Sequence, residues 1–419
     1  MNPYLKAISN AIKKLHEKGN YKPGDLANTK EYKNLIKATF DVLEKSVSDG
    51  TFSNATLQRL RKDIFLFSGL KTHNHLLEAG KLLVDKQGNL KPFEKWKKEV
   101  SKNVDAKHLR YLRAEYDFAV GSVQMAERWA NHQKDTSRYY LQFRTAADER
   151  VRKSHAVLHN ITLPKNDKFW DKYYPPNGWG CRCTAVDVLA SNNEKSDSDK
   201  AVSLGEKATT YINKNGTNKL KIFRFNPGKD KIIFPPHHPY SKVIGAKQVK
   251  PIVLSIFSEQ GFKLIASYKQ GGKVFLHDMV DKKSNDYKRL IEIAKIHAKQ
   301  YNSVVEIMPK IHFKDPLYNI LYKDLIGTKY YKKCPDLRIN GVFFEHEGFT
   351  TSNPKKALKN MLNRGLKQYY NVIIENVALS DRYIKKNIRE RIKSGISINE
   401  ISVIKKDKIY ILYKNTEAR

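Results

Sequence analysis

The hydrophobic pattern changes its period along the chain, and this change limits most strongly what the sequence can fold into. Up to about residue 135, apolar residues recur every three or four positions, as in Leu35, Ile36 and Phe40, which is the pattern of amphipathic helices. From about residue 250, short extended runs alternate with helical ones, which predicts an independent α/β or α+β domain. We therefore expect a multidomain protein with a mainly α N-terminal region (1–135), a mainly α but irregular central module (136–248) and an α/β C-terminal domain (250–419).

Local signals refine this expectation. Asn340 and Gly341 separate two extended runs and predict a hairpin with a type I′ turn. A helix is expected to begin at Pro354, capped near Ser352 or Asn353. Residues 191–201 are polar without an apolar period and are interpreted as a flexible loop or linker, and residues 219–248 as short extended pieces around a turn.

The charge balance points to a polyanionic partner. The 419 residues include 78 Lys and Arg against 43 Asp and Glu, a formal net charge of +35. Such an excess favours nucleic acid, because cationic side chains release the counterions condensed on phosphates. A general enrichment in lysine remains the alternative. There is no run of about 18 apolar residues and no secretory signal at the N-terminus, so we expect no membrane span and synthesis in the cytoplasm.

The central segment carries an ordered series of motifs. They are Arg144-Thr145, the run Asp148 to Arg152, His155, Leu158-His159, Phe169-Trp170, the run Pro175 to Trp179, Cys181-Arg182-Cys183, the run Phe225 to Lys229, and the run His238 to Tyr240. Residues 140–245 thereby resemble the Mu F-type minor head proteins of phages. The resemblance implies a role in head morphogenesis beside the portal and capsid proteins, with the protein in the virion head and in the bacterial host cytoplasm.

Two histidines and two cysteines of this module suggest a metal site. His155 and His159 are four positions apart, as on one helix face, and Cys181 and Cys183 lie on a glycine-rich turn. Two imidazoles and two thiolates would complete a tetrahedral zinc site. Alternatively, the histidines bind loop carbonyls while the cysteines pack in the interior. With three cysteines in all, the chain is no disulfide framework, and a reducing compartment is expected.

The C-terminal domain carries a second set of motifs. They are Val305-Glu306 before Pro309, the run Pro335 to Gly341, Phe344-Glu345, a loop rich in Ser and Thr, and a basic helix. Residues 265–415 resemble the tRNA nuclease domains of contact-dependent inhibition toxins and their phage relatives. The resemblance implies a nuclease toxin carried by a head protein, with tRNA or other RNA as substrate and an immunity protein as a further partner.

The residues themselves suggest a metal-dependent mechanism. Asp336 precedes the hairpin and Glu345 lies on its return strand, so the two carboxylates are expected to meet near one end, with Glu306 as a third. Clustered carboxylates bind Mg²⁺, which activates water against a phosphodiester. Relatives often show Glu-x-Lys where this chain has Glu345-His346-Glu347, and Lys355 or Lys356 is considered for the missing charge.

A metal-free mechanism is the alternative. His346 would act as general base or acid on a ribose hydroxyl, while Arg338 and Lys356 would stabilise the phosphorane. Phosphate contacts are expected from the loop and from the helix that follows it. These residues are Thr350, Thr351, Ser352, Lys355 and Lys359. A structural head protein whose basic C-terminal domain binds DNA or a partner without catalysis also remains open.

Overall fold

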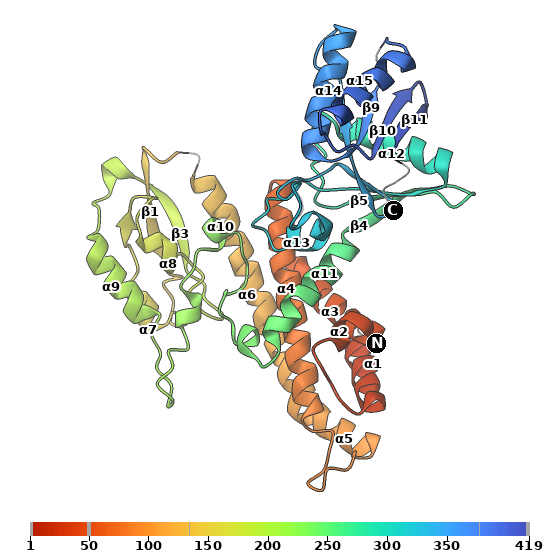
Figure 1. Cartoon of the computed structure of the whole chain (residues 1–419). Coiled ribbons are helices and arrows are strands. Elements are labelled where there is room, and N and C mark those ends of the chain that lie inside the picture. Colours follow the sequence, from red (N-terminus) through yellow and green to blue (C-terminus); the bar gives the residue numbers. More distant parts are fainter. Residues whose placement is uncertain (1–2, 48–51, 134, 377, 416–419) are drawn as a thin grey trace. The chain divides into compact units, whose positions relative to one another are not determined.

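The computed structural model describes residues 3–47, 52–133, 135–376 and 378–415 (Figure 1). Contacts within the chain divide it into two compact units, residues 1–256 and 257–419. The predicted N-terminal region and central module therefore belong to one unit. In the described part of the chain, no helix has both the length and the apolar character needed to cross a membrane.

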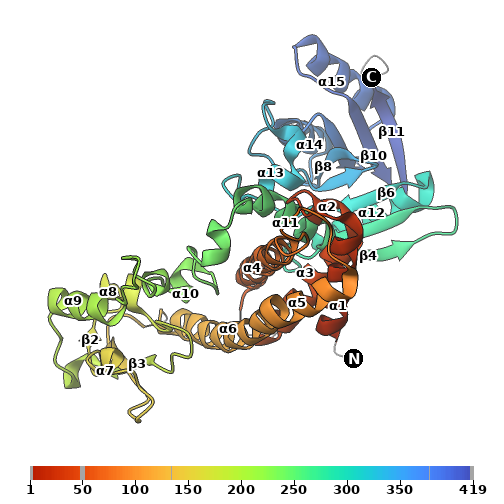
Figure 2. The same cartoon turned by 90° about the horizontal axis from the view of Figure 1, so that it is seen from below.

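The first part of the N-terminal unit is helical, as expected. Its longest helices, α4 and α6, lie side by side in both views (Figures 1 and 2). The elements are α1 (Pro3–Lys18), α2 (Asp25–Asn28), α3 (Lys30–Leu43), η1 (Glu44–Ser46), α4 (Asn54–Gly80), α5 (Phe93–Val100), the π-helix η2 (Ser101–Asp105) and α6 (Ala106–His132).

A buried ion pair joins these two long helices. The Nζ of Lys71 on α4 lies 2.9 Å from an Oε of Glu115 on α6, and both side chains are almost fully buried. The hydroxyl of Tyr240 donates to Glu115 at 2.8 Å. Because an unpaired buried charge is strongly destabilising, this network fixes the 238–240 segment against the helices.

The central module is built around a small antiparallel sheet of order β2-β1-β3. Its elements are β1 (Tyr139–Arg144), α7 (Lys153–Ala156), β2 (Thr162–Leu163), α8 (Phe169–Tyr173), β3 (Thr184–Leu189), η3 (Ala190–Asn192), α9 (Ser198–Ala208), η4 (Lys221–Phe223), α10 (Pro227–Asp230) and η5 (Pro239–Lys242). Aromatic residues, among them Phe143, Phe169 and Trp170, form its core.

Two expectations for this module were wrong. Part of the predicted linker 191–201 is the start of α9, which Asp197 caps by accepting a hydrogen bond from the Lys200 amide at 2.7 Å. The polar composition of that segment reflects a cap and an exposed helix face. Residues 219–248 form short helical turns in place of the predicted extended pieces.

The C-terminal unit is an α/β structure, as predicted, and α11 (Ala246–Gln260) leads into it. Its elements are β4 (Phe262–Ser267), β5 (Lys273–His277), α12 (Tyr287–Tyr301), β6 (Val304–Ile307), α13 (Tyr318–Leu321), η6 (Lys323–Leu325), β7 (Leu337–Ile339), β8 (Val342–Glu347), α14 (Pro354–Gln368), β9 (Asn371–Glu375), α15 (Asp381–Lys393), β10 (Glu400–Lys405) and β11 (Lys408–Lys414).

These strands form one mixed sheet of order β11-β10-β9-β8-β7-β6-β5-β4. Strands β6, β7 and β8 are an antiparallel meander, and β9 pairs with β8 in parallel after the crossover through α14. One apolar core lies between the sheet and α12, and a second lies between the sheet and helices α14 and α15. Helices therefore cover both faces of the sheet.

The β7–β8 hairpin forms as predicted. Asn340 and Gly341 both have positive φ values, 46° and 86°, which a type I′ turn requires. The predicted cap of the next helix is also confirmed, because the Asn353 side chain accepts from the Lys356 amide at 3.1 Å, with Pro354 in the first turn.

Candidate functional site

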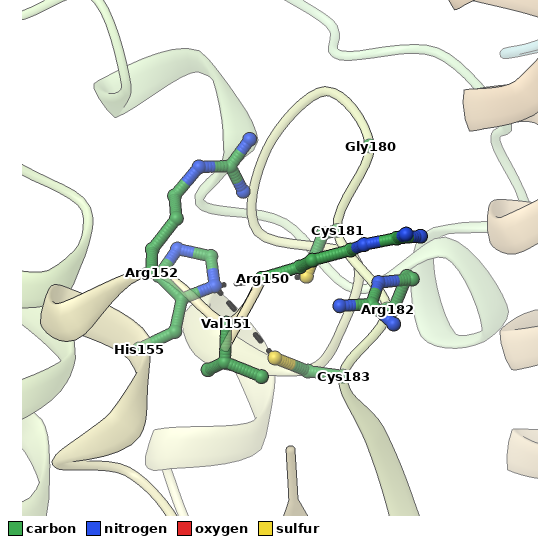
Figure 3. Close-up of a pocket in the computed structure, with 8 residues that line it drawn as sticks. All are labelled: Arg150, Val151, Arg152, His155, Gly180, Cys181, Arg182 and Cys183. Atoms are coloured by element: carbon green, nitrogen blue, oxygen red, sulfur yellow. Dashed lines mark hydrogen bonds between the residues drawn. The ribbon is translucent and has the colours of Figure 1, made fainter. Parts of the chain in front are cut away.

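The first candidate site is a cluster of one histidine and two cysteines in the central module. His155 lies on the short helix α7 and is 2% exposed, while Cys181 and Cys183 follow the turn that contains Gly180. The Nδ1 of His155 lies 3.7 Å from each sulfur. Figure 3 shows the imidazole and the two thiols pointing toward one another, and their ligand atoms all lie within 4.8 Å of each other.

His159 does not join this cluster. Helix α7 ends at Ala156, so His155 and His159 do not share a continuous helix face as the sequence spacing suggested. The Nδ1 of His159 accepts a hydrogen bond from the Thr145 amide at 3.2 Å and lies 2.9 Å from the Thr145 hydroxyl. The structure thus brings together three of the four predicted zinc ligands.

A cavity of about 90 Å³ is lined in part by these three side chains (Figure 3). Its lining includes Arg150, Arg152 and Arg182. Hydrogen bonds from Cys183 and His155 outweigh burial and hold the pKa of Cys181 well below its ordinary value. Two cysteine sulfurs beside an imidazole are a donor set that suits zinc.

The second candidate site is a carboxylate pair in the C-terminal unit. Asp336 directly precedes β7 and is 3% exposed; Glu345 lies on β8 and is 7% exposed. The Oδ1 of Asp336 lies 2.6 Å from the Nζ of Lys310, and its Oδ2 accepts from the His346 amide at 3.0 Å. The Oε2 of Glu345 is buried and has no hydrogen-bond partner among the residues that the structure describes.

The charges of this pair are coupled. Burial, followed by the charge of Asp336, raises the pKa of Glu345 well above its ordinary value. Partial loss of hydration at its ammonium lowers the pKa of Lys310, but the charges of Asp336 and Glu345 outweigh this effect, so that the pKa is raised overall. Two carboxylates and one ammonium therefore form a single electrostatic unit.

The register of the hairpin separates His346 from this pair. Leu337 and Phe344 are paired across β7 and β8, and both contribute to the core beneath α12. Because neighbouring residues of a strand point to opposite faces, Glu345 lies on the other face and His346 on the α12 face. There the His346 Nε2 lies 3.2 Å from Glu375, which also binds Arg289 of α12 at 2.6 Å.

Glu306 lies one strand further along the sheet. Its carboxylate accepts a hydrogen bond from Arg338, its register partner, at 2.5 Å. The predicted third metal ligand and the predicted phosphate contact thus neutralise each other. Among the described residues, three side chains that could bind one metal ion come together at His155, Cys181 and Cys183. The carboxylate site offers two such side chains, Asp336 and Glu345.

Glu347 lies two positions after Glu345 on β8. Its Oε2 accepts two hydrogen bonds from Arg364 of α14, at 2.8 and 2.5 Å. Neither Arg364 nor Lys310 was predicted from the sequence. Lys310 could have been predicted, because it follows β6 closely and so lies near the start of the antiparallel strand β7.

The other predicted nucleic-acid contacts lie around the start of α14. Thr350, Ser352, Lys355, Lys356 and Lys359 are exposed. Thr350 accepts from the Asn360 side chain at 3.0 Å, and the Nζ of Lys355 lies 5.9 Å from the Tyr383 ring. In the described part of the chain, no hydrogen bond or ion pair links Lys355, Lys356 or Lys359 to Asp336 or Glu345.

Comparison with known proteins finds relatives for the part of the chain that holds the first candidate site. Residues 87–186 match the family described as "Phage Mu protein F like protein". The chain is 33% identical over 103 residues to the "Putative capsid assembly protein F" of Escherichia phage Mu, which is 24% of this chain and 21% of that protein. It is 37% identical over 59 residues to the "Mu-like prophage FluMu F protein" of Haemophilus influenzae, 14% of each.

The chain therefore contains a Mu F-like segment, and the two matches span 21% and 14% of these relatives' own lengths. The segment includes the His155–Cys181–Cys183 cluster, and the Asp336–Glu345 pair lies outside it. No solved structure matches the chain.

Proposed function

We propose that this chain is a phage head morphogenesis protein whose C-terminal unit is a metal-dependent nuclease. The Mu F-like segment supports the first part, since the matched Mu protein is described as a capsid assembly protein. The observation that carries the second part is the buried, unpartnered Oε2 of Glu345 beside the charge of Asp336. We infer that the portal and capsid proteins are its partners, in the virion head and in the host cytoplasm.

Burying two carboxylates side by side costs free energy, because both lose hydration and repel each other. Such pairs are retained where they bind or react, and strongly shifted pKa values are common at functional sites. An orphaned hard oxygen next to a second carboxylate fits a divalent cation. Mg²⁺ is often held by one or two carboxylates, with waters and substrate phosphate as the remaining ligands.

When bound, the cation would polarise the phosphodiester and lower the pKa of a bound water. Asp336 and Glu345 would hold it. The His346 amide donates to the Asp336 carboxylate and keeps it oriented, and Lys310 pairs with its other oxygen. Glu306 and Arg338 form an ion pair between the neighbouring strands β6 and β7. Because His346 lies on the opposite face of the sheet, the metal-dependent mechanism is favoured over the histidine mechanism.

The substrate assigned to this nuclease is RNA, with tRNA as the first choice, on the basis of the resemblance to contact-dependent inhibition toxins. An immunity protein would then protect the cell that makes the chain. The net charge of +35 agrees with a polyanionic substrate.

The test is cleavage by the full-length protein of total tRNA and of duplex DNA, each with Mg²⁺ and with EDTA. We expect Mg²⁺-dependent tRNA fragments. Glu345→Gln should abolish them, while the matched control Asp407→Asn, at an exposed carboxylate, should cut like wild type. Fragments that persist with EDTA or with Glu345→Gln would refute the carboxylate mechanism.

A second candidate function is favoured by the same net charge of +35: a structural head protein that binds DNA without cutting it. Stable binding of nucleic acid, with no cleavage of either substrate in Mg²⁺, would support this function against the nuclease.

For the central module we propose a zinc site, in which His155, Cys181 and Cys183 would hold the ion beside the arginine-lined cavity. A small irregular module gains stability from such an ion, because ligand binding is coupled to folding. Absence of stoichiometric zinc in full-length protein purified without chelator would end this proposal.

A further inference from the structure

A basic cavity adjoins the carboxylate pair. It has a volume of about 540 Å³, within the usual range for small-ligand sites. Its lining residues are Lys310, Ile311, His312, Lys332, Lys333, Cys334 and Gln368. Three of them are lysines and none is acidic, so the cavity suits an anion. Lys310 links the cavity to the carboxylate pair, because it lines the cavity and its Nζ lies 2.6 Å from Asp336.

Buried tyrosines hold the two loops that form this cavity. Tyr322 donates through its hydroxyl to the carbonyl of Pro309 at 2.7 Å, which fixes the loop that carries Lys310. Tyr318 donates to the carbonyl of Lys333 at 2.9 Å, which fixes the opposite loop. Lys310 itself joins the loops by donating to the Cys334 carbonyl at 2.7 Å. The cavity is thus preformed by hydrogen bonds that do not depend on a ligand.

An aromatic surface lies next to the lysines. The rings of Phe313 and Tyr331 have centroids 6.1 Å apart, and the Nζ of Lys332 lies 4.7 Å from the Phe313 ring. Tyr331 is 38% exposed. Cationic side chains interleaved with accessible aromatic rings are what single-stranded nucleic acids bind, through phosphate contacts and base stacking.

We propose that this cavity is the phosphate subsite of the nuclease, and that it receives the unpaired strand next to the bond that is cut. The inference rests on the proposed function. Lys332 and Lys333 contact the flanking phosphates. Lys310 bridges the subsite and the carboxylates, and its ammonium contacts the phosphate that reacts.

This assignment gives Lys310 the role that was expected of Lys355 or Lys356. Glu347 is acidic and is paired with Arg364, so neither residue of this pair offers a free cation to the carboxylates. Lys310 reaches the pair from the end of β6, and 58% of its side chain remains exposed for a substrate. The loop that follows β6 therefore supplies the cation of the site.

The experiment measures binding and cleavage separately in the full-length protein. Binding of a short fluorescent single-stranded RNA, and of DNA of the same sequence, is followed by anisotropy in EDTA over a range of salt concentrations. Cleavage of the RNA is measured in Mg²⁺. The variants are Lys332→Gln/Lys333→Gln, Lys310→Gln and Lys310→Arg, and the control is Lys385→Gln/Lys386→Gln, an exposed adjacent pair on α15.

The Lys332/Lys333 double variant should weaken binding about tenfold and raise KM. It should also reduce the slope of log affinity against log salt by roughly 0.7 for each lost phosphate contact, while the α15 control keeps the slope. Lys310→Gln should lower kcat more than it raises KM, and Lys310→Arg should recover part of kcat.

Each result has a distinct meaning. If the Lys332/Lys333 variant binds with the wild-type affinity and salt slope, the subsite is refuted, even when the wild type cuts RNA. If Lys310→Gln keeps the wild-type kcat, Lys310 is only a counter-ion of Asp336 and its assigned contact is refuted. If binding depends on Lys332 and Lys333 but no variant or wild type cleaves, the proposed nuclease fails while the strand-binding cavity stands. Equal binding of RNA and DNA would assign recognition to the shared phosphodiester.

Discussion

Arg364 of α14 donates two hydrogen bonds to the Oε2 of Glu347 at the end of β8, at 2.8 and 2.5 Å. The pair lies beside Glu345, and its contact removes a third negative charge from the surroundings of the carboxylate site. Since α14 connects the parallel strands β8 and β9, the crossover helix also sets the charge of the site.

The Arg364–Glu347 pair gives the first prediction. Arg364→Met leaves Glu347 9% exposed without its partner, and burial already raises the pKa of that carboxyl. Because Arg364 is partly exposed, we expect a loss of about 1–2 kcal/mol in the free energy of unfolding. Urea unfolding of both single variants and of Arg364→Met/Glu347→Met measures the coupling, and the double variant should regain most of the loss. Strict additivity would show that the pair is not coupled.

A second prediction concerns the effect of the carboxylate pair on the free energy of unfolding. Glu345→Gln removes an ionisable group that is buried next to Asp336 and keeps the shape of the side chain. We expect the free energy of unfolding to rise by about 1–3 kcal/mol, since buried charges are often replaced by neutral groups with a gain in stability. Thermal unfolding without divalent cations is the measurement. A lower Tm for Glu345→Gln would mean that this carboxylate is stabilising and would argue against a strained functional pair.

A third prediction concerns acid stability. Burial lowers the pKa of His277 and of His297 to about 4, whereas an exposed imidazole titrates near 6.5. Both groups are neutral in the folded chain and take up protons on unfolding below pH 6.5. Their stability contribution is therefore complete above that pH and is lost as the pH falls toward about 4.

At pH 5 the expected loss is about 2 kcal/mol for each histidine relative to pH 7. Urea unfolding at the two pH values measures it for wild type, and His297→Gln should lose correspondingly less. If His297→Gln shows the same pH dependence as wild type, His297 does not titrate as described.

The fourth prediction distinguishes the two histidines of the central module. His155→Ala, Cys181→Ser and Cys183→Ser should each lose bound zinc in full-length protein, because each removes one of three ligands. His159→Ala should keep it, since that side chain bonds to Thr145. Elemental analysis after purification without chelator is the measurement. Loss of zinc in His159→Ala, with the fold intact by circular dichroism, would contradict the three-ligand site.

The sequence predicted those features whose causes are local. The Asn340-Gly341 turn follows from the positive φ values that these residues favour, and the Asn353 cap follows from a short side chain that can accept a hydrogen bond at the start of a helix. The pairings of Lys310 and Arg364 with acids on other elements depend on the order of the strands, which the hydrophobic pattern does not specify. The position of His346 could have been predicted, because neighbours on a strand cannot face the same site. His159 was predicted to share a helix face with His155, but this spacing requires one continuous helix, and α7 ends at Ala156.

The central claim is that Asp336 and Glu345 form a metal-dependent nuclease centre. Its most direct test is Mg²⁺-dependent cleavage of total tRNA by full-length wild type beside Asp336→Asn, which keeps the acceptor for the His346 amide and removes the charge. The account predicts discrete fragments with wild type in Mg²⁺, none with EDTA, and a loss of at least about a hundredfold in rate with Asp336→Asn, the scale expected when a group that stabilises the transition state is removed. Equal rates for the two proteins, or intact tRNA with both, would contradict it.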